Sequence, residues 1–228
     1  PLNNIEIYGQ FVLDDLDFQY LKMDFDSLFV KYGLKESRSY DKYQYWLNKW
    51  GVQCGVRYVD VLGIRNLDLQ FEYNRVRPFT FAHGDQSQNV SHYYQALAHP
   101  LGANFSENIV QINYRFKEKW RFLFESFYAN YGLDSIGSNY GKDIHKNPYF
   151  PGLDLYADGY FDVKVGQGIQ TSWELQRLTI SYEWKHNLYI DLKIAHRRIN
   201  SQEDNYNSNK WFYGLALRWN AIPFRHNF

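Results

Sequence analysis

The chain lacks the features that define several common classes of protein. Among its 228 residues there is one cysteine, Cys54, which excludes a disulfide within the chain. Its 25 acidic and 25 basic side chains give a formal net charge of zero, so charge provides no reason to expect a nucleic-acid partner. No apolar run approaches the roughly 18 residues of a membrane-spanning helix. The polar start at Pro1 does not have the form of a signal peptide, and we interpret the chain as processed or truncated at its N-terminus.

Aromatic residues, in contrast, are abundant. They make up 20% of the chain, with 21 Tyr, 17 Phe and 7 Trp, although the mean hydropathy is that of a polar protein. Both properties can occur together if apolar and polar residues alternate. A transmembrane β-barrel requires this alternation, because each strand has one face toward lipid and the other toward a polar interior.

Apolar and polar residues alternate about eight times along the chain, most cleanly over residues 67–74. There Leu, Leu, Phe and Tyr occupy the odd positions, and Asp, Gln, Glu and Asn occupy the even positions. A period of two predicts β-strands with one apolar and one polar face. The strands that we predict span residues 4–13, 47–59, 66–75, 107–117, 120–131, 175–185, 188–198 and 210–219. Most are near the roughly nine to eleven residues that a tilted strand needs to cross a bilayer, whereas soluble strands average about five or six.

The predicted connections alternate between short and long. Short ones fall at residues 61–65, 117–119 and 185–187, and long ones, rich in Gly, Asn, Ser, Asp and Pro, cover 14–46, 76–106, 132–174 and 199–209. This pattern is typical of outer-membrane barrels, whose short turns face the periplasm and whose long loops are extracellular. We therefore predict an all-β fold in which residues 1–228 form one transmembrane, antiparallel, up-and-down β-barrel domain. The alternative is a soluble β-sandwich with aromatic core strands.

The spacing of large aromatic residues agrees with a membrane-spanning barrel. Three pairs on predicted outward faces are each eight residues apart: Trp50 and Tyr58, Trp120 and Tyr128, and Trp211 and Trp219. Eight residues span roughly 26 Å along a strand, or roughly 20 Å along the membrane normal when the strand is tilted. We expect these side chains, together with Trp184, to lie at the two membrane–water interfaces.

The central segment resembles a known family. The points of likeness are RVRPFTFAH (75–83), the pair Tyr93 and Tyr94, ALAHPLGAN (96–104) and the strand ENIVQINYRF (107–116). They are similar to Wzi-type capsule-assembly proteins of the bacterial outer membrane, particularly the surface adhesins and lectins of gliding Bacteroidetes. The resemblance implies a protein that binds extracellular or capsular polysaccharide, in capsule attachment or in adhesion and gliding motility. Barrels of this family have more than eight strands, so we expect either a small closed barrel or the C-terminal part of a larger one.

The loop over residues 76–106 contains the candidate site. Aromatic rings stack on sugars, while Arg, Asn and His side chains donate hydrogen bonds to hydroxyl or carboxylate groups. The candidate glycan-binding residues are Arg75, Arg77, His83, His92, Tyr94, His99 and Asn104. An equally weighted interpretation is that Arg77 and the histidines fix a folded loop in the barrel mouth. A metal site at His83, His92 and His99 lacks a zinc spacing, and a hydrolase based on Ser91 lacks a nucleophile elbow.

These considerations predict a non-enzymatic protein with no catalytic residue, metal or cofactor, placed in the outer membrane with its loops at the cell surface. Its expected partners are outer-membrane lipid and polysaccharide. Two other hypotheses are a porin-like channel and an accessory barrel subunit of a secretion or motility complex. Charges facing the interior are expected to pair with one another. For the acidic residues of the first loop (Asp14, Asp15, Asp17, Asp24 and Asp26), exposure to solvent is the default expectation.

Overall fold

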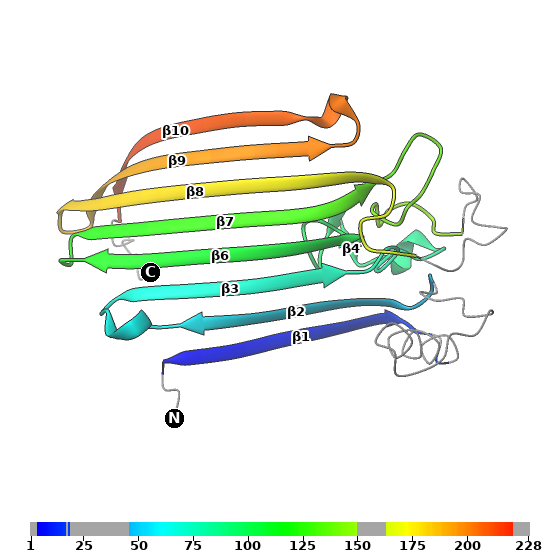
Figure 1. Cartoon of the computed structure of the whole chain (residues 1–228), viewed down its shortest axis with the longest axis horizontal. Helices are drawn as coiled ribbons and strands as arrows, with labels where there is room; N and C mark the ends of the chain where they lie inside the picture. The colour runs from blue at the N-terminus through cyan, green and yellow to red at the C-terminus, as the bar shows by residue number, and fades with distance from the viewer. Residues whose placement is uncertain (1–3, 17, 19–45, 150–162, 221–228) are drawn as a thin grey trace, which may run out of the picture.

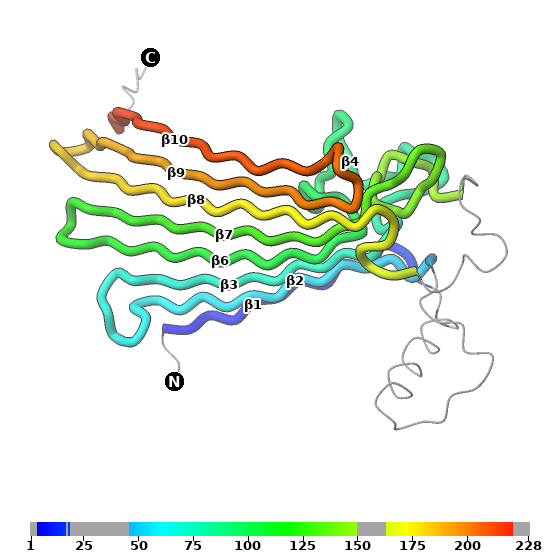
Figure 2. The backbone as a smooth tube through the Cα atoms, turned by 45° about the horizontal axis from the view of Figure 1, so that its top comes forward, coloured from blue at the N-terminus to red at the C-terminus, as the bar shows by residue number. Residues whose placement is uncertain are grey.

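A computed structural model describes residues 4–16, 18, 46–149 and 163–220 and shows one large antiparallel sheet (Figure 1). Eight strands lie side by side in the order in which they occur in the chain. They are β1 (Ile5–Asp15), β2 (Lys49–Tyr58), β3 (Leu67–Val76), β6 (Phe105–Phe116), β7 (Trp120–Leu133), β8 (Ile169–Lys185), β9 (Leu188–Ser201) and β10 (Ser208–Trp219). Short turns connect the strands at one end of the sheet, and the longer segments lie at the other end, called here the loop end (Figure 2).

The remaining elements are small. A second sheet consists of β4 (Ser91–His92) and β5 (Gln95–Ala96), and three 3-10 turns cover Val61–Gly63, Gln86–Gln88 and Asp204–Tyr206. Within the ranges that the structure describes, no helix is long and apolar enough to cross a membrane. All eight strands predicted from alternation are therefore confirmed, and the fold of the described residues is all-β.

The main difference from the predicted strands lies at the loop end. Strand β8 begins at Ile169 rather than at residue 175, and β9 continues to Ser201 rather than residue 198. The extra part of β8 is rich in Gln, Thr and Ser, so it has no apolar alternation that could reveal it. It is a strand because its backbone pairs on both sides, with Ile169 opposite Leu133 and Thr171 opposite Ser201.

The register of the strands keeps polar side chains on one face of the sheet. Asp68 lies opposite Asn113, and Gln70 lies opposite Gln111, which in turn lies opposite Glu125. We call this the polar face. The opposite, apolar face contains long cross-strand rows, such as Leu67, Tyr114, Phe122, Ile180, Leu192 and Leu215.

The apolar face is uncovered among the described residues. On β10, Leu215 and Leu217 are 78% and 68% exposed, and on β1 Ile7 is 78% exposed. The register places six of the predicted interface aromatics on this face: Trp50, Tyr58, Trp120, Tyr128, Trp211 and Trp219. Trp184 lies at the register shift near the end of β8 and is exposed. The single Cys54 is also on this face. A sandwich would need a second large sheet against this surface, and the described residues contain only the two-stranded β4–β5 sheet besides the large one.

Charged side chains on the polar face pair across strands, as the sequence predicted for interior charges. The Arg177 guanidinium donates two hydrogen bonds to Glu125, at 2.7 and 2.9 Å. Arg218 donates two to Asp191, at 2.8 and 3.2 Å. Such two-pronged pairs are stronger than single ones and fix the direction of both side chains.

The sheet is open. Among the described residues, β1 pairs only with β2 and β10 pairs only with β9. The expectation of a small barrel closed by these eight strands alone is therefore wrong. The physical reason is that, within the described ranges, no backbone pairing joins β1 to β10.

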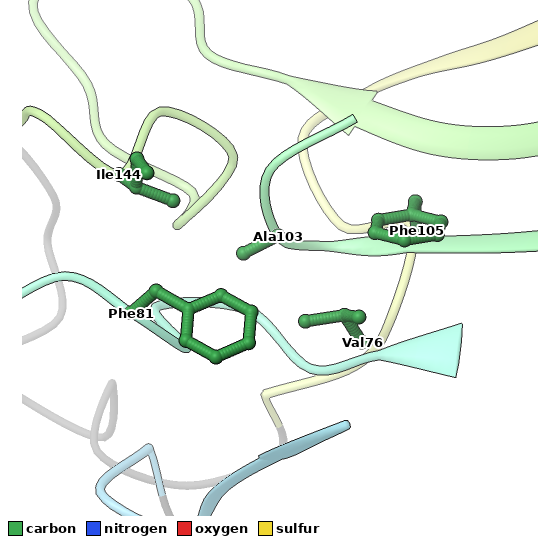
Figure 3. Close-up of a cluster of buried hydrophobic side chains, with 5 residues drawn as sticks. All are labelled: Val76, Phe81, Ala103, Phe105 and Ile144. Atoms are coloured by element: carbon green, nitrogen blue, oxygen red, sulfur yellow. The ribbon is translucent and has the colours of Figure 1, made fainter. Parts of the chain in front are cut away.

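At the loop end, the polar face becomes apolar and is covered by a folded structure. Val76 and Phe105, at the ends of β3 and β6, pack against Phe81, Ala103 and Ile144 from the connecting segments (Figure 3). We call residues 77–104, 134–149 and 163–168 the loop cap. Within the predicted long loop 132–174, residues 134–149 and 163–168 fold back onto this end of the sheet. Predicted loop residues 19–45 and 150–162 lie outside the described residues.

Gly132 makes close contact between β7 and the loop cap possible. A Cβ at this position would lie 1.6 Å from the Gln167 carbonyl oxygen. We expect Gly132→Ala to lower the free energy of unfolding by about 1–3 kcal/mol, because the backbone at Gln167 must move to make room for the methyl group. Gly214→Ala is the matched control, since its Cβ would meet nothing nearer than 3.8 Å. Chemical unfolding of both variants checks this, and equal stabilities would contradict it.

Candidate functional site

Asp14 on β1 and Lys49 on β2 connect the sheet to the loop cap through hydrogen bonds. The Asp14 carboxylate accepts a hydrogen bond from the Phe81 backbone N–H at 2.8 Å and lies 3.1 Å from His83 Nε2. The fully buried Lys49 ammonium donates to the Ala82 carbonyl at 2.9 Å and lies 3.7 Å from Asp15. The acidic residues of the first loop were expected to be exposed to solvent, and this expectation is wrong for Asp14. Asp17, Asp24 and Asp26 lie outside the described residues.

Asn104 joins three parts of the loop cap and is fully buried. Its Nδ2 donates to the carbonyl oxygens of Gly132, Tyr140 and Gln167, at 3.1, 3.3 and 2.9 Å. Its Oδ1 accepts from the Gly166 N–H at 2.7 Å. Every polar atom of this side chain is therefore used within the protein, and its amide holds the connecting segments together.

Arg77 and His99 also have partners inside the molecule. Arg77 is buried, with its guanidinium 5.9 Å from the centre of the Trp50 ring and Nη2 3.5 Å from the Val163 carbonyl. His99 Nε2 lies 3.1 Å from Glu107 Oε2, and its ring stacks on Phe105. Four of the candidate residues therefore make contacts that hold the folded loop together: Arg77, His83, His99 and Asn104. A direct contact of these side chains with sugar stays a prediction.

Arg75 lies apart from the other candidates. It is exposed on β3 and points to the apolar face, because Val76, the next residue, contributes to the buried cluster on the other face. The structure does not bring Arg75 together with the loop-cap residues.

His92 and Tyr94 lie at the tip of the β4–β5 hairpin, where side chains are accessible. Tyr93 and Tyr94 are both 86% exposed. The ring of Tyr93 contacts that of His92, and the ring of Tyr94 lies 5.4 Å from that of His145. The hairpin therefore presents two neighbouring phenol rings to solvent.

The backbone at this tip is strained. Tyr93 and Tyr94 have φ values of 47° and 57°, in the left-handed region that turns of this kind usually fill with Asn and Gly. Large side chains in this region cost of order 1–3 kcal/mol each, and such strain is concentrated at functional sites. Asn and Gly in place of these two tyrosines would remove this cost.

A cavity of about 640 Å³ lies beside the hairpin. Its lining includes Tyr94 and Leu101 from one segment, Lys142, Ile144 and His145 from the other, and Tyr131 from β7. The volume is within the range of small-molecule sites, and the lining combines aromatic and apolar surface with a few polar groups. Tyr94 is the one member of the predicted set that lines this cavity.

Lys142 is the most perturbed ionisable group of the loop cap. Its ammonium donates to the Leu101 carbonyl and lies 4.7 Å from the centre of the Tyr131 ring. Burial lowers the pKa of Lys142 from 10.5 to about 8, against the opposing effect of Asp134, Asp143 and Glu107. Sequence reasoning missed Lys142, Tyr131 and His145, because nothing in the local pattern shows that residues 131 and 142–145 meet residues 94–101.

The described part of the chain assembles neither a metal site nor a hydrolase site at Ser91. No group of three or more His, Cys, Asp or Glu side chains there could hold a metal ion, and His83 and His99 face separate carboxylates. No hydrogen bond joins the Ser91 hydroxyl to a histidine among these residues.

Comparisons with known proteins add no relative: no family model matches the chain, and no match was found among the curated proteins or the solved structures.

Lys142 should titrate near pH 8 in the folded protein. The unfolded chain holds this proton up to its ordinary pKa of 10.5, so the free energy of unfolding should rise with pH between these two values. Reductive ¹³C-methylation followed by NMR checks the pKa, with Lys142→Met to assign the resonance. The same variant should lose this part of the pH dependence. A Lys142 resonance that titrates at or above the ordinary lysine value would contradict the prediction.

Proposed function

We propose that the chain is a sector of an outer-membrane β-barrel whose loop cap binds polysaccharide at the cell surface. The observation that carries the membrane assignment is the separation of the two faces of the sheet. One face exposes Leu, Ile, Phe or Trp side chains on seven of the eight long strands, while the other carries paired Arg, Asp and Glu side chains. Soluble monomers rarely expose contiguous apolar patches larger than a few hundred Å².

The distribution of aromatic residues supports the same proposal. Tyr58, Trp120, Trp184 and Trp219 lie near the short turns, and Trp50, Tyr128 and Trp211 lie nearer the loop end. Two such bands, with aliphatic residues between them, correspond to the two interfaces of a bilayer. The loop cap would then lie on the extracellular side.

Two adjacent substitutions on β10 test the membrane assignment. Leu215 lies midway between Trp211 and Trp219 on the apolar face, whereas Ala216 faces the polar side opposite Asp191. Leu215→Arg should destabilise the protein folded in lipid vesicles by about 2–4 kcal/mol, because the charge would meet the bilayer centre. Ala216→Arg is the matched control and should be much less destabilising, because its charge would lie on the polar side opposite Asp191. If both variants fold into vesicles equally well, the apolar face does not contact lipid.

The hairpin tip and the adjacent cavity support polysaccharide as the ligand. Tyr93 and Tyr94 present ring faces that can stack on sugars, and His92, His145 and Lys142 supply hydrogen-bond donors around them. The resemblance of the central segment to capsule-assembly and adhesin barrels points to the same ligand class. The protein would act without catalysis, in capsule attachment or in adhesion and gliding.

Replacing the two tyrosines by the residues that the turn favours separates binding from folding. Tyr93→Asn with Tyr94→Gly should raise the free energy of unfolding by about 1 kcal/mol or more, because it relieves backbone strain. The same double variant should lose at least about tenfold in retention of capsule-type polysaccharides on a glycan array, which corresponds to about 1.4 kcal/mol.

Tyr206→Asn is the control for this experiment, since Tyr206 is an exposed tyrosine in the β9–β10 connection. It should leave glycan retention unchanged. Retention by the double variant equal to that of the wild type, or no retention by the wild type, would reject the glycan proposal.

A second candidate function is that of an accessory subunit in a secretion or motility complex. The unpaired outer edges of β1 and β10 among the described residues favour it, because open sheet edges are not stable in the lipid interior. Further strands must satisfy these edges, and a partner protein is one source. Co-purification of a stoichiometric partner in mild detergent would support this function, and a monodisperse monomer would count against it.

A further inference from the structure

Some cationic side chains of the polar face have no acidic partner among the residues that the structure describes. Between β2 and β10, three arginines each have their own acidic partner: Arg57 with Asp68 at 4.0 Å, Arg177 with Glu125 at 2.7 Å and Arg218 with Asp191 at 2.8 Å. The guanidinium groups of Arg115 and Arg121 have no hydrogen bond or ion pair with any residue that the structure describes. Lys193, on β9, also has no salt bridge in this part of the chain.

Arg115 and Arg121 lie directly opposite each other on β6 and β7. Like charges at opposed positions on neighbouring strands are destabilising, so the pair is a cost to the fold. On its other side, Arg121 lies opposite Ser181 of β8, which is uncharged. An anion placed between the two guanidinium groups would remove this repulsion.

Two hollows on the polar face meet at Arg121. One, of about 350 Å³, lies between β2 and β7 and includes Arg57 and Gln111 in its lining. The other, of about 340 Å³, lies between β7 and β10 and includes Thr179 and Lys193. Its two carboxylates, Glu125 and Asp191, are the ones already paired with Arg177 and Arg218. Arg121 and Leu123 line both hollows. Arg121 is therefore a cation without a carboxylate partner that can be reached from either side.

We propose that this region is an anion-binding site, centred on Arg121 and completed by Arg115 and Lys193, for an oxyanion such as a sulfate, phosphate or carboxylate group. Arginine recognises these groups through two parallel N–H donors, and Gln111 and Thr179 add neutral polar groups to the walls. The site goes beyond the proposed function, because it lies on the sheet and not in the loop cap. The anion is either a free ion or an acidic group on a larger molecule, such as a uronate sugar.

Calorimetric titration of the purified full-length chain, in an uncharged detergent at low ionic strength, tests the proposal. Sodium sulfate, sodium phosphate and sodium glucuronate should each give saturable binding, and glucose should give none. Tighter binding of glucuronate than of the inorganic ions would identify an acidic sugar as the source, and the reverse order would identify a free ion. Arg121→Gln should weaken anion binding by at least about tenfold, and Arg115→Gln should weaken it in the same direction.

Arg198→Gln is the matched control, because Arg198 is an exposed arginine on the opposite face of β9. It should bind the anions as the wild type does. Arg121→Gln should melt at an unchanged or higher temperature, since it removes a like-charge contact, so weaker binding would not reflect unfolding. The Tyr93→Asn, Tyr94→Gly variant should retain anion binding, which separates this site from the glycan proposal. Wild-type protein without saturable anion binding, or Arg121→Gln with unchanged affinity, would overturn the inference.

Discussion

Cross-strand pairing in a single register is the constraint on which the rest of this structure depends. Side chains alternate between faces along a strand, so a shift of one residue would move every Leu and Trp of that strand to the charged side. The observed register prevents this mixing over all eight strands and brings Arg177 to Glu125 and Arg218 to Asp191. The apolar surface, the hollows around Arg121 and the platform for the loop cap all result from this one arrangement.

The strands and their faces could be predicted from the sequence because the signal is local. Each predicted strand carries its own period-two pattern, and pairing between sequence neighbours needs only a short turn. The pattern failed where a polar stretch such as Gln170–Ser172 becomes a strand through pairing on both sides. It also could not show that the sheet stays open, because closure depends on the relation between the first and last strands and not on any one of them.

The candidate site was less predictable because its contacts join distant parts of the chain. The Asp14 carboxylate meets Phe81 and His83 across more than 60 residues. Residue types alone could not separate a buried Asn104, whose amide holds three segments, from an exposed Tyr94 at a strained turn. Polar residues in a long loop indicate hydrogen bonding, but the sequence does not say whether the partner is a ligand or the protein itself. The Lys142 environment, formed by Leu101 and Tyr131, left no local pattern to detect.

In the proposed barrel, the directions of the two edge strands limit which further strands can join β10 to β1. Strand β1 runs from the short-turn end toward the loop end, and β10 runs the opposite way. An antiparallel neighbour of β1 must therefore run from the loop end to the short-turn end, and an antiparallel neighbour of β10 must run the other way. A set of added antiparallel strands meets both conditions only if it contains an even number of strands. A single added strand is thus excluded, whereas a second set of eight strands, or any number of complete hairpins, is allowed.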